Sequence, residues 1–392
     1  MEKGLLIAHG GGPTAVLNAS LYGVIKEAKR QGIKNIIAAK NGIGGILREN
    51  LISLNNITER ELELLLNTPG SAIGTSREAL TAEDYDVMLD ILTKNNIGYV
   101  LLNGGNGTMD ACGKLYHSCC KKNVNINVIG IPKTTDNDLA VTDHSPGFGS
   151  AARYIAQSVR EVCIDVASLP IHVVVIETSG RNAGWIAAAS SLASDGNAFG
   201  PDLIYLPERP FSEDKFISDI KEKLRVKRGV VVVVSEGLKN IKGEPIAEPV
   251  FETDRAVYFG DVGAYLANLV IKRLGYKARS EKPGLFGRSS IAMQSRIDRD
   301  EAVLVGKYAC KSSIDGYSGK MVALKRISST PYKSEPFLTD IDNVMMCERL
   351  VPDEFINEEG NGVTEAFKEW CHPLIGECFG DTADFSNYLK KD

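Results

Sequence analysis

Short apolar runs alternate along this chain with longer segments of helical periodicity, and this alternation most constrains the fold. The apolar runs predict strands at residues 4–8, 35–39, 99–102, 124–129, 172–176, 203–206 and 229–234. Helical periodicity predicts helices at about residues 18–31, 82–95, 108–121, 147–165, 182–191, 213–226 and 257–273. Strands that alternate with helices of this length form βαβ units, so the sequence predicts an α/β protein with mainly parallel sheets.

The remaining segments give weaker signals. A chain of 392 residues is long enough for two or three domains. The polar stretch 237–254, which contains Gly243 and Pro245, is predicted to be a flexible loop. Residues 295–310 have helical periodicity, residues 321–324 are apolar, and the tail after Ser329 shows no clear alternation.

Charge and cysteine usage exclude several classes of function. The net charge of −5 and the absence of a long basic run give no electrostatic basis for nucleic-acid binding. No apolar stretch has the length of a membrane span. The eight cysteines lack the paired CxxC spacing of a zinc site, so we expect reduced thiols and a cytoplasmic enzyme.

The segment from Gly130 to Leu139 carries the strongest chemical signal. It follows the apolar run 124–129 and contains Lys133, Thr134, Asp136 and Asp138. In open α/β sheets, ligands bind at the carboxyl ends of strands. A carboxylate there can take a proton from a hydroxyl group while a lysine neutralises a phosphate. A solvated loop is the alternative, since Asp and Asn are common turn residues.

Two glycine-rich turns also follow predicted strands and lead into helices. They occupy residues 8–18 and 103–110, and neither has the spacing of a P-loop or a dinucleotide-binding turn. Glycines let backbone N–H groups approach a phosphate, and a helix N-terminus adds partial positive charge. One such turn alone is more often structural. Two of them together with residues 133–138 predict a polyphosphate site.

A few charged residues are placed to contact a ligand. Arg77 ends a Gly/Ser turn, Arg181 follows the strand at 172–176, and Glu236 follows the very apolar strand at 229–234. An unpaired carboxylate after a buried strand needs a partner such as a sugar hydroxyl. Arg279 and Arg288 flank residues 280–287. For any single arginine, a surface ion pair is the alternative.

Six motifs in order resemble the phosphofructokinase A family over roughly residues 4–310. They are GGPTAVLN, GGNGT, PKTTDND, GFGSAARY, ETSGRNAGW and the late pair of arginines, and the tail fits the longer, pyrophosphate-type branch. The resemblance implies two similar Rossmann-like three-layer α/β domains with the active site in the cleft between them. It places a donor-phosphate domain at 1–140 with part of the C-terminal region, a sugar-phosphate domain at 141–325, and a C-terminal extension at 326–392.

The resemblance also implies an activity and a role for each site residue. The family transfers a phosphoryl group, with Mg²⁺, to the 1-hydroxyl of fructose 6-phosphate, giving fructose 1,6-bisphosphate in glycolysis. By motif, Asp136 is the general base, Asn106 and Asp138 lie at the metal, and Lys133, Arg77 and Arg181 act on the transferred group. The donor phosphates would contact Gly11, Gly12, Arg77, Gly105, Asn106, Gly107, Thr108 and Lys133. The sugar phosphate would contact Thr134, Asp136, Ser179, Gly180, Arg181, Glu236, Arg279, Leu285 and Arg288.

The motifs give opposing indications of the donor. Asn106, Lys133 and Pro13 resemble the pyrophosphate branch, whereas Gly107 stands where that branch carries an acidic residue that excludes the α-phosphate of a nucleotide. A glycine leaves that space open, which favours ATP slightly. Ser179 replaces the usual Met, and Leu285 replaces the usual His or Tyr, so a related acceptor such as sedoheptulose 7-phosphate stays open.

Three functions therefore stand as alternatives: an ATP-dependent 6-phosphofructokinase, a pyrophosphate-dependent fructose 6-phosphate 1-phosphotransferase, and a non-catalytic sugar-phosphate or nucleotide-binding regulator. The complete set of Asp136, Asp138, Arg77 and Arg181 argues against the regulator, because a binding protein needs no general base. In the family a neighbouring subunit supplies some contacts to the 6-phosphate, so the resemblance implies a homodimer or homotetramer.

Overall fold

The computed structural model describes residues 3–194, 199–253, 256–377 and 379–383. The chain forms two compact units, each assembled from separate segments. The first contains residues 1–154, 284–351 and 373–375, and the second contains residues 155–283, 352–372 and 376–392. Residues 284–351, which the sequence interpretation divided between the sugar-phosphate domain and the C-terminal extension, thus belong with the N-terminal segment.

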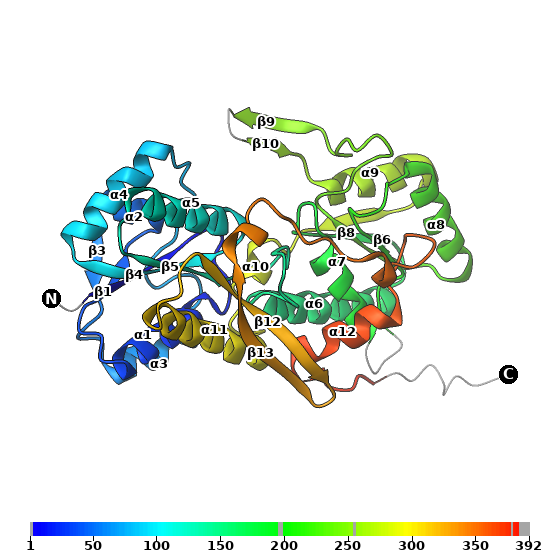
Figure 1. The fold of residues 1–392 in the computed structure, drawn as a ribbon. Helices are drawn as coiled ribbons and strands as arrows, with labels where there is room; N and C mark the ends of the chain where they lie inside the picture. The colour runs from blue at the N-terminus through cyan, green and yellow to red at the C-terminus, as the bar shows by residue number, and fades with distance from the viewer. Residues whose placement is uncertain (1–2, 195–198, 254–255, 378, 384–392) are drawn as a thin grey trace. The chain divides into compact units, whose positions relative to one another are not determined.

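The first unit is built on a seven-stranded sheet with the order β13-β12-β5-β4-β1-β2-β3 (Figure 1). Its central strands β12, β5, β4, β1 and β2 are parallel, and the edge strands β3 and β13 are antiparallel to their neighbours. The strands are β1 (Gly4–His9), β2 (Ile36–Ala39), β3 (Leu51–Ser53), β4 (Ile97–Gly104), β5 (Asn127–Pro132), β12 (Lys320–Ser329) and β13 (Tyr332–Asp340).

Helices cover both faces of this sheet because the strands are apolar on both faces. In β1, Leu5 and Ile7 pack with α1 (Leu17–Arg30), α3 (Glu59–Leu65) and α11 (Arg296–Ile314), whereas Leu6 and Ala8 pack with α2 (Ile43–Leu47), α4 (Ala82–Lys94) and α5 (Asn106–Lys122). The short helix α10 (Leu285–Arg288) also belongs to this unit. The unit is therefore a three-layer α/β domain.

The second unit contains a four-stranded parallel sheet with the order β11-β6-β8-β7. Its core joins alternate residues of β6 and β8 to helices α8 and α9, and Trp185 of α7 contacts the rings of Phe355, Phe367 and Trp370. The elements are β6 (Val173–Thr178), α7 (Trp185–Ala189), β7 (Leu203–Tyr205), α8 (Glu213–Val226), β8 (Val230–Ser235), β9 (Pro249–Thr253), β10 (Ala256–Phe259), α9 (Val262–Leu274) and β11 (Ala278–Glu281). Two helices are divided between the units: residues 148–154 of α6 (Phe148–Ser168) and 373–375 of α12 (Glu365–Ile375) belong to the first.

The predicted α/β class with mainly parallel sheets is confirmed, but two local predictions are wrong. The stretch 237–254 contains β9, and residues 256–259 form β10 rather than the start of a helix. Helix α9 begins only at Val262, after Gly260 and Asp261, which favour a turn and a helix start. The tail after Ser329 contributes β13, which pairs with β12.

The cysteines and the helices of the described residues bear on the classes of protein considered from the composition. Seven of the eight cysteines lie in the described part of the chain, and all seven are free thiols: Cys112, Cys119, Cys120, Cys163, Cys310, Cys347 and Cys371. Burial raises the pKa of Cys112 and Cys163, so these two thiols stay protonated at neutral pH. No helix among the described residues is both long and apolar enough to span a membrane.

Candidate active site

The ends of three neighbouring strands bring the three predicted motifs together in the first unit. His9 at the end of β1 lies beside Asn103 of β4, and Gly104 lies beside Pro132 of β5. Hydrogen bonds continue past the strands, from the Gly10 N–H to the Asn103 carbonyl at 2.8 Å and from the Lys133 N–H to the Gly104 carbonyl at 3.0 Å. The two glycine turns and residues 133–138 therefore share one edge of the sheet.

The first glycine turn is held by the loop that carries Arg77. The Gly11 N–H donates to the Ser76 carbonyl at 2.9 Å, and the Thr75 hydroxyl donates to the Gly11 carbonyl at 2.8 Å. Gly11 has φ +76°, a conformation that strongly favours glycine. Arg77 does not follow a strand, as the sequence had suggested, because Ser76 makes only an isolated bridge with Gly10.

Three cationic side chains converge on this turn. The Lys133 ammonium donates to the Gly12 carbonyl. A Cβ atom at Gly12 would lie 3.6 Å from Arg288 Nη1 and 3.7 Å from Arg77 Nη2. Burial lowers the pKa of Lys133 to about 8; Arg77 and Arg288 act in the same direction, whereas Asp136 opposes them. Cations that depress one another's protonation in this way form a site for a multiply charged anion.

The second glycine turn opens helix α5. Gly105 is the N-cap, so the partial positive charge of the helix N-terminus lies at this turn, where the Thr108 N–H donates to the Gly105 carbonyl at 2.9 Å. A Cβ atom at Gly10 would lie 2.1 Å from Thr108 Oγ1, so the two glycine turns pack closely against each other. Gly107 is exposed, and no heavy atom lies within 4 Å of the position that its Cβ would occupy. The space around Gly107 is open.

The carboxylates of residues 136 and 138 lie in a braced loop. The Asp136 N–H donates to Thr134 Oγ1 at 3.1 Å, and Asn106 Nδ2 donates to Asp138 Oδ2 at 2.9 Å. Burial and the charge of Asp136 raise the pKa of Asp138. Asn137, which lies in the predicted motif but was assigned no role, is fully buried with φ +55°, and its Oδ1 accepts from the Ser145 N–H at 2.9 Å. The tolerance of Asn for positive φ was the available signal.

Two buried oxygens in this loop fit a cation. Asn106 Oδ1 and Asp138 Oδ1 are buried and accept no hydrogen bond, although the other side-chain polar atoms of these residues are joined to each other. Among the described residues no group of three or more His, Cys, Asp or Glu side chains could hold a metal by itself. A metal bound here would therefore need further oxygens from a ligand, which is how Mg²⁺ is usually held with phosphates.

In the second unit, Glu236 organises the loop of Ser179, Gly180 and Arg181. Glu236 Oε1 accepts from the N–H groups of Gly180 and Arg181, both at 3.3 Å. Gly180 has φ +136° and Arg181 has φ +49°, so the loop is tightly turned. The backbone amides of the loop thus supply two hydrogen-bond donors to this carboxylate, and a sugar hydroxyl as a further partner stays a prediction.

The late pair of arginines is divided between the units. Arg279 lies on the edge strand β11 of the second unit and is exposed, whereas Arg288 ends helix α10 in the first unit. Leu285, the first residue of α10, is 70% exposed. Arg288 is partly buried, and burial, followed by the charge of Arg77, lowers its pKa. The first unit by itself thus contains Arg288 beside the glycine turn, without Arg279.

Comparison with known proteins shows which family this chain belongs to. The sequence model described as "Phosphofructokinase" matches residues 4–312. The chain belongs to the phosphofructokinase family. Members of this family are phosphotransferases, and this chain is one of them.

Three relatives illustrate the range of names within the family. The pyrophosphate–fructose 6-phosphate 1-phosphotransferase of Xanthomonas campestris is 37% identical, over 95% of this chain and 91% of the relative. A sulfofructose kinase of Alkalicoccus urumqiensis is 33% identical, over 94% of each chain. The crystal structure of a pyrophosphate-dependent phosphofructokinase from Nitrosospira multiformis superposes with a TM-score of 0.89 at 34% identity, covering 98% of this chain and 94% of that one.

Proposed function

We propose that this phosphofructokinase transfers a phosphoryl group to the 1-hydroxyl of fructose 6-phosphate. The observation that carries the proposal is the convergence of Lys133, Arg77 and Arg288 on the Gly11–Gly12 turn, with Asp136 close after Lys133 in the loop that follows β5. Cations neutralise a phosphoryl group in transfer, and a nearby carboxylate can accept the proton of the attacking hydroxyl. A regulator that only binds sugar phosphates would not need both parts.

Each of the site residues has a role in this proposal. Asp136 acts as general base on the sugar hydroxyl, and Thr134 orients it. Gly11, Gly12, Gly105, Asn106, Gly107 and Thr108 line the subsite of the donor phosphates, together with Lys133 and Arg77. Arg181 stabilises the transferred group, and Ser179, Gly180 and Glu236 bind the sugar. Arg279 and Leu285 bind the 6-substituent of the sugar, whereas Arg288, which lies beside the Gly11–Gly12 turn, acts on the transferred phosphoryl group and not on the 6-phosphate that the resemblance implied.

The reaction requires a divalent cation, for which we propose Mg²⁺. Asn106 and Asp138 would hold it through the two buried oxygens that accept no hydrogen bond. When bound with the donor, the ion neutralises charge on the phosphate oxygens. One amide and one carboxylate are few ligands, which agrees with a metal that arrives with the donor phosphates.

For the donor we propose ATP, with pyrophosphate as the alternative. The open space at Gly107 accommodates an α-phosphate and the nucleoside beyond it. The names of the Xanthomonas and Nitrosospira proteins favour pyrophosphate instead. Initial rates of fructose 1,6-bisphosphate formation with each donor decide between them. Turnover with ATP at least tenfold above that with pyrophosphate supports the proposal, and activity with pyrophosphate alone contradicts it.

Sulfofructose is a second candidate acceptor. A 33% identical relative is named sulfofructose kinase, and Leu285 places an exposed apolar side chain in the segment assigned to the 6-substituent. A sulfonate carries less charge than a phosphate and accepts fewer strong hydrogen bonds, so a leucine suits it better than His or Tyr does. Parallel measurements of kcat/KM with fructose 6-phosphate, sulfofructose and sedoheptulose 7-phosphate rank the acceptors.

The cellular setting follows from the thiols and the resemblance. Free cysteines are typical of a reducing compartment, so we propose a cytoplasmic enzyme. We also propose a homodimer or homotetramer, because in the family a neighbouring subunit completes the contacts to the 6-phosphate.

A further inference from the structure

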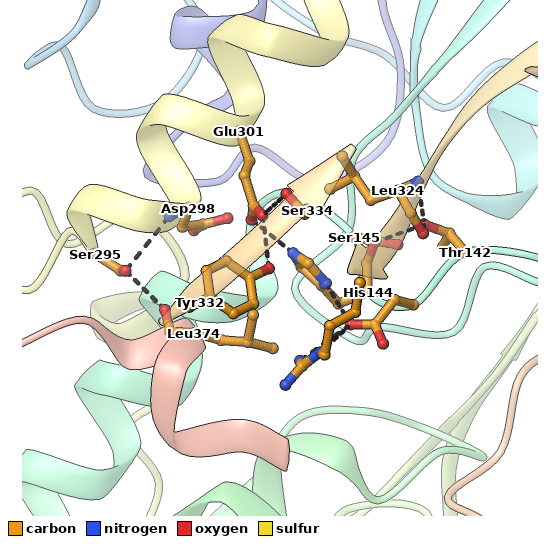
Figure 2. Close-up of polar contacts among 12 residues, drawn as sticks. Thr142, His144, Ser145, Ser295, Asp298, Glu301, Leu324, Tyr332, Ser334 and Leu374 are labelled. Carbon is orange, nitrogen blue, oxygen red and sulfur yellow. Dashed lines mark hydrogen bonds and ion pairs between the residues drawn. The ribbon is translucent and has the colours of Figure 1, made fainter. Parts of the chain in front are cut away.

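A buried ion-pair network, made of Asp143, His144, Glu301 and Arg326, follows Asp136 and Asp138 in the first unit. His144, which is 1% exposed, lies between two carboxylates: its Nδ1 is 2.8 Å from Asp143 Oδ2, and its Nε2 is 2.6 Å from Glu301 Oε2. Figure 2 shows the carboxylate of Glu301, which comes from helix α11, beside His144 and beside Tyr332 and Ser334 of strand β13. Tyr332 and Ser334 both donate to Glu301 Oε1.

The geometry requires a positively charged imidazole. A carboxylate oxygen only accepts hydrogen bonds, so a ring flanked by two carboxylates must donate from both nitrogens. Arg326 of β12 donates to Asp143 Oδ2 at 3.1 Å and lies 5.2 Å from the centre of the Tyr332 ring. Burial lowers the pKa of His144, but Glu301 and Asp143 outweigh it and raise the pKa to about 9.

Two further charged residues, Asp298 and Arg349, lie near the network. Asp298 of α11 is buried, and burial raises its pKa to about 6 although the N–H groups of Gly147 and Ser150 donate to it. Arg349 is mostly buried, and burial lowers its pKa to about 10 while Asp143 opposes the shift. Its backbone N–H donates to the Asp138 carbonyl at 2.9 Å. Asp298 therefore contacts the loop at Gly147, and Arg349 contacts it at Asp138.

The contacts of residues 142–147 connect this network to the candidate active site. Thr142 accepts from the Leu324 N–H at 3.0 Å, and the Ser145 N–H donates to Asn137, which stands between the two Asp residues. Thr134 and Gly147 form a parallel bridge, so the two ends of the segment 134–147 lie side by side. Movement of His144 would therefore be transmitted to both ends of the segment 134–147.

We propose that His144 is a positioning residue for phosphoryl transfer. Its ion pairs with Asp143 and Glu301 tie the 134–147 loop to helix α11 and to the β12–β13 hairpin. The C-terminal hairpin thereby holds the general base and the proposed metal carboxylate in place, without touching a substrate itself. This inference rests on the proposed function for its kinetic consequences, but not for the anchoring of the loop.

His144→Gln tests the proposal, with His117→Gln as the matched control. His117 also pairs with an aspartate, Asp342, at 3.0 Å in the same unit, but both side chains are more than half exposed. We expect H144Q to lower kcat about 10- to 100-fold, the range expected when a catalytic group is misplaced, with the sugar KM changed less than threefold. H117Q should leave both constants unchanged.

Hydrogen–deuterium exchange supplies a readout that needs no substrate. In H144Q we expect faster exchange across residues 134–147 than in the wild type, with residues 97–104 of β4 unchanged. Wild-type kcat in H144Q, or unchanged exchange of the loop, overturns the positioning role. A wild-type protein that phosphorylates no sugar overturns the proposed function alone, because the exchange result still stands.

Two further variants keep the test decisive. H144Q leaves the buried Glu301 carboxylate without its cationic partner, and H144Q/E301Q removes that charge as well. We therefore expect kcat of the double variant to be at least threefold above that of H144Q; no recovery contradicts the ion-pair account. Should H144Q fail to fold, Tyr332→Phe removes one donor to Glu301 and preserves the rest. We expect it to lower kcat about two- to fivefold and to speed exchange of the loop, and wild-type values of both overturn the proposal.

Discussion

At the scale of single residues, the chemistry is concentrated in side chains that follow strand ends. Asp136 is partly exposed, and its backbone N–H is fixed by Thr134, so its carboxylate is held at the edge of the sheet. Gly107 presents no side chain to the open space beside it. In the proposed function, Asp136 supplies the general base and Gly107 leaves room for a ligand.

Asp136→Asn should abolish most turnover without unfolding the protein. Removal of a general base costs typically ~10²–10⁴-fold in kcat, and an amide of nearly the same shape leaves the hydrogen bond to Thr134 available. Steady-state kinetics and sugar binding by calorimetry check this, with Asp90→Asn on the exposed face of α4 as control. Near-normal turnover would exclude Asp136 as the base.

Gly107→Asp should block ATP and spare pyrophosphate. Two like charges about 4 Å apart repel by about 4 kcal/mol at an effective dielectric constant of 20, and pyrophosphate has no α-phosphate to meet the new carboxylate. The ratio of kcat/KM for the two donors is the measurement, and Gly107→Ala separates bulk from charge. Full ATP activity in the aspartate variant would show that this position does not select the donor.

At the scale of elements, two loops that carry candidate site residues are each held by contacts within their own unit. The 134–147 loop is tied to α11 and the β12–β13 hairpin, and the 179–181 loop of the second unit is tied to Glu236 and Gly237. Such bracing permits backbone conformations that a free loop would rarely adopt, as at Asn137 and Arg181.

The His144 network should make stability fall at alkaline pH. The pKa of His144 is raised from 6.5 to about 9 in the folded protein, so its stabilisation is fully present below pH 6.5 and is lost as the pH rises through about 9. Chemical denaturation at pH 6, 7.5 and 9 should show a loss on the order of 2–3 kcal/mol in the wild type and a smaller loss in H144Q. Parallel curves for both proteins would mean that His144 does not carry the charge.

Gly237→Ala should displace the loop of Arg181. A Cβ atom at Gly237 would lie 1.5 Å from the Arg181 carbonyl oxygen, so the backbone must move. We expect kcat/KM for the sugar to fall roughly 10²-fold, since a displacement of about 1 Å suffices for such a loss. Gly380→Ala in the same unit, where a Cβ meets no atom within 4 Å, is the control. Equal kinetics of the two variants would argue against a role for this loop.

At the scale of the whole molecule, the enzyme is expected to assemble. The first unit contains Arg288 but not Arg279, and the family resemblance assigns part of the 6-phosphate contacts to a neighbouring subunit. Sedimentation should therefore give a mass of two or four chains of 42.4 kDa. A monomer with full activity at the concentration of the assay would contradict this prediction.

The sequence by itself determined the α/β class and the motifs at the strand ends. Apolar runs, helical periodicity and the turn chemistry of Gly, Asn and Asp act over a few residues, so β1, β4 and the two glycine turns were predictable from neighbouring residues alone. The same local signals failed at β10, where a β-favouring segment directly precedes α9 and was merged with it.

Only the tertiary structure decided which distant residues support these motifs. The pairing of His144 with Glu301 joins residues 157 positions apart, and β12 joins the sheet beside β5 after almost two hundred intervening residues. Two other contacts also join residues far apart in the sequence. The Gly180 and Arg181 amides donate to Glu236, and Arg288 approaches Gly12. Periodicity records which face of an element is buried, but not which partner covers it, because a partner is selected by packing and charge across the whole fold.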